Sequence, residues 1–230
     1  CISCHDGRNH LEKVNLWLTQ RKRAEMWRHA SFFGKTFIDP SFGRFPHFQV
    51  KDTRKGYDLT TRSSLRPPRT AKEDVTPTFL LTGERPSPNE NQRHAYARML
   101  TTHPQFARAA VNLFWAELMG QGIVDGPFDF DLARQDPKNP PPAPWTVQPS
   151  HPELLEALAD DFRTHNHDLR RLFKLIVTSR AYQLSGKAPT GWKSTYDSYF
   201  ARRLTRRLSA EQTWDAIAHT AGTPQSFKIT

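Results

Sequence analysis

Apolar residues recur at helical spacing in separate stretches of the chain. The first stretch runs from Leu11 to Phe33, where the spacing predicts one helix with a wide aromatic face. A second helix is expected from about Glu90 to Thr101. A third is predicted to begin at Pro104 and to stop at Gly120, because proline suits the first position of a helix and glycine the position after its end.

Three later stretches carry capping signals. Ser150 begins an S-x-x-E sequence, in which the hydroxyl and the glutamate can satisfy backbone N–H groups at the start of a helix. Asp168 precedes another amphipathic stretch and is expected to cap it. Ser209 begins a second capping box, S-A-E-Q, and Gly222 is placed to stop the last predicted helix.

The segments between these helices are rich in proline, glycine and polar residues and show no periodicity. The longest covers residues 37–88 and includes the run Arg-Pro-Pro-Arg at 66–69; another covers residues 126–149. We predict a mainly α fold, a helical domain with long irregular Pro/Gly-rich connections. The predicted divisions are an N-terminal segment with a helix (1–36), an extended irregular connector (37–88) and a helical domain (89–230).

The composition restricts the function classes. Its 33 Lys+Arg against 23 Asp+Glu give a formal charge of +10, which favours an anionic partner or surface. No zinc-finger spacing, RNP-like motif or basic heptad accompanies the charge, so we expect no nucleic-acid binding. No window approaches the roughly 20 apolar residues of a membrane span. The chain starts with cysteine and without a leader, which indicates a processed or partial sequence.

The candidate chemistry lies at the start of the chain. Cys1, Cys4 and His5 form a C-x-x-C-H motif, and these are the only cysteines of the sequence. In this spacing two thiols can add to the two vinyl groups of one haem, and the next histidine reaches the iron from the proximal side. We therefore predict a haem c near the N-terminus, held by the segment of residues 1–36.

Two other interpretations of the cysteines stay open. A local disulfide or redox pair is typical of a βαβ context, which this helical, loop-rich sequence lacks. A zinc site would need a second ligand pair at a characteristic spacing, and neither a second C-x-x-C nor an H-x-x-x-H is present.

The second axial ligand of the iron is less constrained by the sequence. His10 follows His5 too closely to reach the opposite face of the same iron easily. His29 and Met26 are separated from the motif by enough chain to fold back onto it, and we favour His29 as the distal ligand over Met26. Ordinary packing in the helix is the alternative role for both.

An acidic loop offers a further candidate site. Asp125, Asp129, Asp131 and Asp136 could gather around calcium, although their spacing fits no EF-hand and a solvated loop is the favoured interpretation. The chain has no phosphate-binding glycine loop, no G-x-S-x-G elbow and no H-E-x-x-H helix. Without an acid–base or nucleophile constellation, we do not expect an enzyme.

Two parts of the chain resemble domains of unknown function, numbered 1549 and 1553, which accompany cytochrome-like domains in planctomycete and acidobacterial proteins. Residues 1–7 resemble the end of the first, whose larger N-terminal part would then be absent here; its relatives usually have Asp-His after the motif, where this chain has Asp6 and Gly7. The stretch from about Pro77 to Thr223 resembles the second. This second resemblance is carried by residues 95–100, 106–112, 114–115, 120–124, 151–155 and 207–211.

The predicted function follows from the motif and the resemblance together. One haem without a catalytic constellation predicts an electron-transfer or haem-scaffold component of an extracytoplasmic assembly, in the periplasm or at the cell surface. Its partners would be other redox or envelope proteins. The alternative is a structural or binding module of the cell envelope in which haem is only a structural staple.

Overall fold

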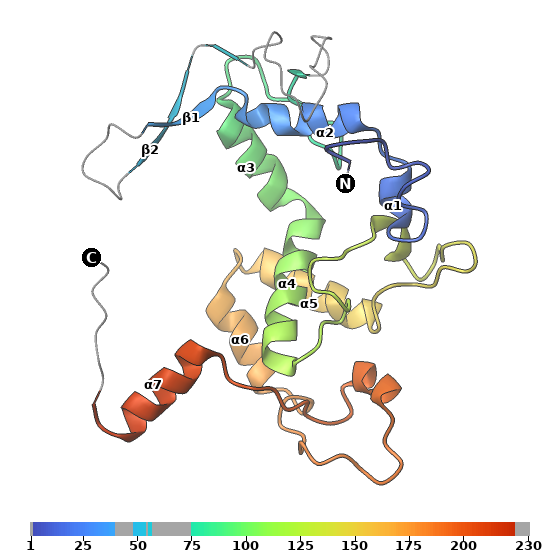
Figure 1. Ribbon diagram of the computed structural model, residues 1–230, viewed down its shortest axis with the longest axis vertical. Helices are drawn as coiled ribbons and strands as arrows, with labels where there is room; N and C mark the ends of the chain where they lie inside the picture. The colour runs from blue at the N-terminus through green and yellow to red at the C-terminus, as the bar shows by residue number, and fades with distance from the viewer. Residues whose placement is uncertain (1, 40–47, 54, 57–74, 224–230) are drawn as a thin grey trace.

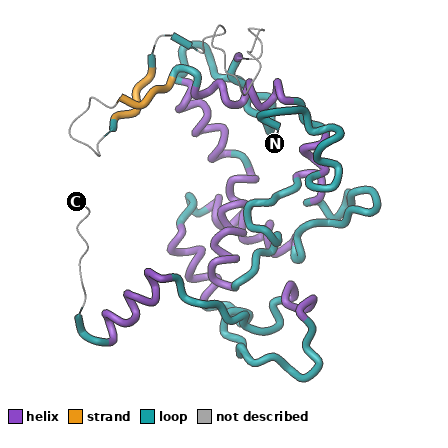
Figure 2. Tube along the Cα trace, viewed as in Figure 1, coloured by secondary structure: helices purple, strands orange, loops and turns teal. Residues whose placement is uncertain are grey.

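The computed structural model describes residues 2–39, 48–53, 55–56 and 75–223 (Figure 1). Over these residues the fold is mainly helical, as the sequence predicts, and the connections between helices are long and irregular (Figure 2). The α-helices, 3-10 helices (η) and strands are α1 (Leu16–Thr19), α2 (Arg23–Ala30), η1 (Ser31–Phe33), β1 (Thr36–Asp39), β2 (Gln49–Asp52), α3 (Gln92–Thr102), α4 (Pro104–Met119), η3 (Leu132–Arg134), α5 (Pro152–Thr164), α6 (Leu169–Val177), η4 (Ser194–Tyr199) and α7 (Ala210–Thr220).

Helices α3 and α4 follow one another through the middle of the molecule (Figure 1). The Asn91 side chain caps α3 by accepting from two backbone N–H groups, and the His103 ring caps α4 by accepting from the N–H of Gln105. Pro104 occupies the first turn of α4, and Gly120 ends it with φ of +89°. The predicted start and stop of this helix are confirmed. Both could be predicted because the two signals are local and act without tertiary contacts.

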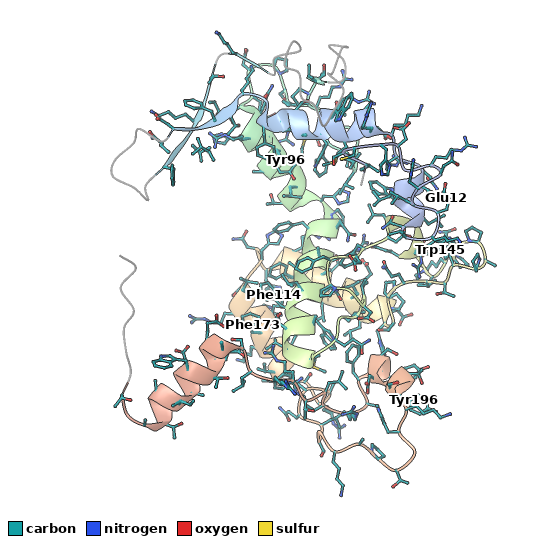
Figure 3. The ribbon with its side chains drawn as sticks, in the orientation of Figure 1. Glu12, Tyr96, Phe114, Trp145, Phe173 and Tyr196 are labelled. Carbon is teal, nitrogen blue, oxygen red and sulfur yellow. The ribbon has the colours of Figure 1, made fainter. Side chains whose placement is uncertain are left out.

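The larger core lies where α4 packs against α5 and α6. Val111 of α4, Leu155 of α5 and Ile176 of α6 are almost completely buried. Phe114 and Phe173 meet edge to face at its border, with ring centroids 5.1 Å apart (Figure 3). Burial of each such aliphatic or aromatic side chain contributes about 1.5–3 kcal/mol, so this contact supplies much of the stability of the domain.

A second, smaller core joins segments that are far apart in the sequence. Phe32 of η1, Phe79 of the loop before α3, and Met99 of α3 are buried together. His29 lies at its edge, in ring contact with Phe32, Phe79 and Tyr96. This cluster takes residues from all three predicted divisions of the chain, so the part of the predicted connector around Phe79 packs in a core.

The prediction of one continuous helix from Leu11 to Phe33 is wrong. Two short helices and a 3-10 turn replace it, with α1 beginning at Leu16 and α2 at Arg23. Asn15 caps α1 by accepting from the N–H of Leu18. The break at residues 20–22 brings the carbonyl of Arg21 to the N–H of Gly7, 2.9 Å away. A long-range hydrogen bond therefore replaces helical bonds that the periodicity favoured.

The predicted connector contains a hairpin that the sequence pattern did not indicate. Strands β1 and β2 pair antiparallel, with Ile38 opposite Val50. Asp52 at its end accepts from the Arg93 guanidinium at 2.9 Å and from the Asn91 amide at 2.7 Å. The hydrogen bond from Arg93 is the largest cause that lowers the pKa of Asp52. The run at 66–69 lies outside the described residues.

The capping predictions for the last three helices have different outcomes. Asp168 and Ser209 cap α6 and α7 as predicted, and Ser209 forms the reciprocal capping box. The prediction for Ser150 is wrong, because His151 precedes α5 and the Ser150 hydroxyl donates instead to the carbonyl of Ile123. Ser150 is thus used to join two loops.

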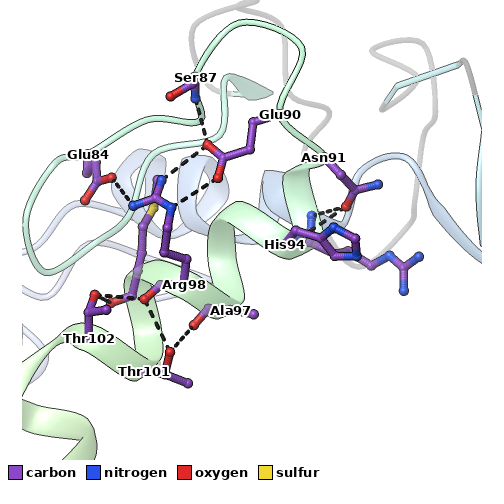
Figure 4. Close-up of polar contacts among 11 residues, drawn as sticks. Glu84, Ser87, Glu90, Asn91, His94, Ala97, Arg98, Thr101 and Thr102 are labelled. Atoms are coloured by element: carbon purple, nitrogen blue, oxygen red, sulfur yellow. Dashed lines mark hydrogen bonds and ion pairs between the residues drawn. The ribbon is translucent and has the colours of Figure 1, made fainter.

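An ion-pair network fixes the loop before α3 to the surface of that helix (Figure 4). Arg98 donates to Glu84 at 2.8 Å and to Glu90 at 3.1 Å. Glu90 also accepts from the backbone N–H of Ser87. The network holds the loop in the position from which Phe79 reaches the smaller core.

His29 generates a prediction about pH. Burial lowers its pKa below the ordinary 6.5, because the charged imidazolium loses solvation. The unfolded chain then binds a proton that the folded chain rejects, so the free energy of unfolding should fall as pH drops below about 6.5 and level off below the folded pKa. Denaturant unfolding monitored by tryptophan fluorescence between pH 7.5 and pH 4.5 measures this.

The matched control is His29→Asn, which keeps an acceptor near the position of Nδ1 but does not titrate. The loss of stability on acidification should be smaller in this variant than in the wild type. His103, whose pKa is also lowered by burial, is present in both proteins and cancels in the difference. Parallel curves for the two proteins would refute the assignment to His29.

Candidate functional site

The N-terminal motif is described from its second residue onward, and Cys1 lies outside the described residues. Ile2 is buried, while the thiol-bearing Cys4 is exposed and His5 is half-buried. The motif forms a series of turns and not a helix. An exposed thiol is open to modification, and a half-buried imidazole beside it is shielded on part of its surface.

The hydrogen bond of His5 decides which ring nitrogen is available. Nδ1 lies 2.8 Å from the carbonyl oxygen of Asp6. A carbonyl can only accept, so Nδ1 carries the proton and Nε2 keeps its lone pair. Histidines that bind metals usually donate their second ring N–H to a carbonyl or carboxylate in this manner. His5 therefore has the tautomer that a metal ligand requires.

His10 lies directly beside His5. The two ring centroids are 4.1 Å apart, and the rings are tilted by 38°. Rings in such close contact leave no room for a porphyrin between them in this arrangement. The expectation that His10 does not serve the opposite face of the same iron stays a prediction.

The motif is anchored to α1 and α2 through the residues that follow it. Asp6 Oδ1 accepts from the backbone N–H of Arg23 at 2.7 Å, and the Arg23 guanidinium donates to the carbonyl of Cys4 at 3.1 Å. A Cβ at Gly7 would lie 1.8 Å from the Leu18 carbonyl oxygen. The close approach of two backbones requires glycine here, which explains why no side chain follows Asp6.

Asp131 attaches this whole N-terminal segment to the helical domain. Its carboxylate is buried and accepts from the N–H groups of Leu16 at 2.6 Å, Trp17 at 2.9 Å and Ala133 at 3.1 Å. Beside it, the Asn15 amide donates to the carbonyl of Phe130 at 3.0 Å. These bonds close a contact across more than a hundred residues of sequence.

The two predicted distal ligands lie on α2. His29 Nδ1 accepts from the N–H of Leu80 at 3.1 Å, so the proton of the neutral ring resides on Nε2. Its ring contacts belong to the smaller core and not to the motif. Met26 is half-buried. For His29 to bind iron through Nε2, the ring would have to give up the bond from Leu80.

Two carboxylates of the acidic loop accept hydrogen bonds from backbone N–H groups. Asp131 serves as described above, and Asp136 accepts from the N–H of Lys138 and the amide of Asn139. Among the described residues, no group of three or more His, Cys, Asp or Glu side chains is placed to hold a metal ion. The calcium interpretation of this loop gains no support from the geometry.

Sequence reasoning missed Asp131, Asn15 and the role of Gly7. Asp131 was one of four similar aspartates, and nothing local separates it from Asp129. Gly7 did carry a signal, since a glycine directly after a functional motif indicates close backbone approach. The motif, by contrast, is recognisable because two lone cysteines and a histidine stand at one characteristic spacing.

The fold and the site together define a helical domain that carries a C-x-x-C-H segment bound to its surface. Residues 92–142 and 145–228 match the family described as PSD1, protein of unknown function (DUF1553). These ranges make up more than half of the chain, so the protein belongs to this family. No curated protein and no solved structure matches it. No helix in the described part of the chain is long and apolar enough to cross a membrane.

The Asp131 contact gives a prediction of stability. Asp131→Ala leaves three backbone N–H groups without their acceptor and should lower the free energy of unfolding by about 1–3 kcal/mol. Amide hydrogen exchange at Leu16 and Trp17 should become faster, because those N–H groups lose their partner. Asp129→Ala, an exposed carboxylate of the same loop, is the control.

Equal hydrogen exchange at Leu16 in the two variants would contradict the assignment. A lower free energy of unfolding with unchanged hydrogen exchange at Leu16 and Trp17 would mean that Asp131 acts only on its own loop, through Ala133.

Proposed function

We propose that this protein carries a haem c bound through Cys1 and Cys4, with His5 as the proximal ligand of the iron. The observation that supports this most directly is the His5 hydrogen bond to the Asp6 carbonyl, which leaves Nε2 free to coordinate. The exposed thiol of Cys4 is accessible for a thioether bond. The isolated motif in the sequence supports the same assignment.

The residues around the motif have distinct roles in this proposal. Asp6 fixes the His5 ring through its carbonyl and the start of α2 through its carboxylate. Gly7 permits the close approach that holds the motif against α1. When bound, a haem supplies one-electron chemistry, and the protein supplies ligands, orientation and solvent exclusion.

Electron transfer within an extracytoplasmic assembly is the role we propose for such a site. Thioether attachment of haem belongs to compartments outside the cytoplasm, so the protein would act in the periplasm or at the cell surface. The partners would be other redox or envelope proteins. The net charge of +10 favours an anionic partner surface.

One observation favours the alternative role of a structural or binding module. Helix α7 has no buried residue, and it exposes Trp214 and Ile217, while Leu208 before it is also exposed. Exposed apolar residues at one element are typical of protein contacts. In that case the haem would only staple the N-terminal segment. The two roles differ in whether electrons leave the haem during turnover with a redox partner.

Covalent attachment is tested on the protein produced with a cytochrome c maturation system in the periplasm. Denaturing electrophoresis with peroxidase staining should leave haem on the polypeptide, and the Cys1→Ser/Cys4→Ser double variant should lose the stain. His5→Ala keeps both cysteines for attachment but lacks the proximal ligand of the iron. A colourless wild-type band, with zinc found by elemental analysis, would instead support the zinc interpretation.

The distal ligand is tested in the same material. With His29 as the sixth ligand the iron would be low-spin, so His29→Ala should shift the visible spectrum toward high spin. Ligation by His29 requires that its hydrogen bond from the N–H of Leu80 breaks. His29→Asn keeps an acceptor for that N–H but removes the imidazole, so it separates loss of the ligand from loss of the hydrogen bond. Met26→Leu examines the weaker candidate. If all three variants keep the wild-type spectrum, the ligand comes from elsewhere.

A further inference from the structure

A cavity of about 820 Å³ lies between the first turns of α4 and α5 and the loop that follows η3. This volume falls within the roughly 300–1,000 Å³ of small-molecule sites in proteins. None of its lining residues belongs to the N-terminal motif. The cavity is lined by His103, Gln105, Arg108, Leu132, Gln135, Asp136, Pro137, Lys138, Pro152, Glu153 and Glu156.

Two glutamines of the wall have carboxamides without partners. Both the oxygen and the nitrogen of the Gln105 and Gln135 carboxamides are covered by protein atoms and make no hydrogen bond. Buried polar groups are nearly always paired in native proteins, and an unpaired one calls for an explanation such as a ligand. Each carboxamide is both a donor and an acceptor, and both glutamines line the cavity.

The charges of the wall are partly matched within the protein. Arg108 holds Glu156 through two hydrogen bonds, one of them 2.9 Å long. Lys138 and Glu153 are exposed, line the same cavity and form no ion pair among the described residues. The wall therefore offers one ammonium and one carboxylate outside its ion pair, together with two carboxamides, and the Asp136 carboxylate lies near the Lys138 charge.

We propose that this cavity binds a short peptide with free ends. Its terminal ammonium would pair with Glu153 and its terminal carboxylate with Lys138. Its peptide groups would pair with the carboxamides of Gln105 and Gln135, since a peptide group offers one N–H and one carbonyl and thus complements a carboxamide on both sides. The His103 ring adds a donor, because its Nδ1 accepts from the N–H of Gln105 and its Nε2 carries the proton.

A neutral sugar is the competing ligand, because hydroxyl groups can also pair with carboxamides. Sugar rings commonly stack on aromatic side chains, and no phenylalanine, tyrosine or tryptophan is among the lining residues. A sugar also has no use for an unpaired ammonium and an unpaired carboxylate. The wall thus favours the zwitterionic peptide.

The experiment is a titration of the whole protein with trialanine, followed by ¹H–¹⁵N NMR. We expect saturable shifts of the Gln105 and Gln135 side-chain NH₂ signals, with a dissociation constant below about 10 mM. Trialanine with an acetylated N-terminus and an amidated C-terminus should bind about 10-fold more weakly, because both ion pairs are lost. Each of Glu153→Gln and Lys138→Met should weaken the binding of trialanine by about 3-fold.

Lys187→Met, which removes an exposed lysine outside the cavity, is the matched control and should bind as the wild type does. In Glu153→Gln, blocking the N-terminus of trialanine should no longer weaken binding. In Lys138→Met, blocking the C-terminus should no longer weaken it. The proposal is overturned if trialanine produces no saturable shift, if the blocked peptide binds as tightly, or if di-N-acetylchitobiose binds where trialanine does not.

Discussion

The buried carboxylate of Asp131 is the contact on which the arrangement of the two parts of this protein depends. A buried charge is costly unless it is hydrogen-bonded, and here three backbone N–H groups from two segments satisfy it. Ile2 and Leu11 add buried apolar area in the N-terminal segment. The position of the motif is thus set largely by one side chain of a distant loop.

Two histidines illustrate how a single hydrogen bond directs chemistry. His5 donates from Nδ1 and has Nε2 free, whereas His29 accepts at Nδ1 and has Nε2 protonated. At the level of sequence both are histidines near a cysteine motif. The backbone group that each ring meets, a carbonyl or an N–H, leaves the Nε2 lone pair of His5 free and lets His29 join a loop to a core.

Local signals explain which parts of the fold could be predicted. Pro104, Gly120, Asp168 and Ser209 act within a few residues of their own position, and each was found where expected. The break in the first helix could not be predicted, because it depends on a bond between Gly7 and Arg21. The C-x-x-C-H motif could be recognised for the same reason of locality.

Non-local contacts explain the rest. The sequence predicts Ser150 as a helix cap, but its hydroxyl donates to the carbonyl of Ile123, a residue 27 positions earlier. The hairpin of β1 and β2 is short and has its end fixed by Arg93 of α3. Asp131 is indistinguishable in sequence from its neighbours, and only the fold brings Leu16 to it. Such contacts are properties of the assembled chain and leave no pattern at either partner.

The loop from Asp131 to Lys138 connects the two sites physically. Its first residue binds the N-terminal segment, and its later residues Gln135 and Lys138 line the cavity. Gln148 holds it in place, accepting from the N–H of Asp131 at 2.8 Å and donating to the carbonyl of Asp129 at 2.7 Å. A displacement of one end of so short a segment is passed to its other end through the covalent backbone and one 3-10 turn. The proposed peptide site and the proposed haem site therefore share a structural support.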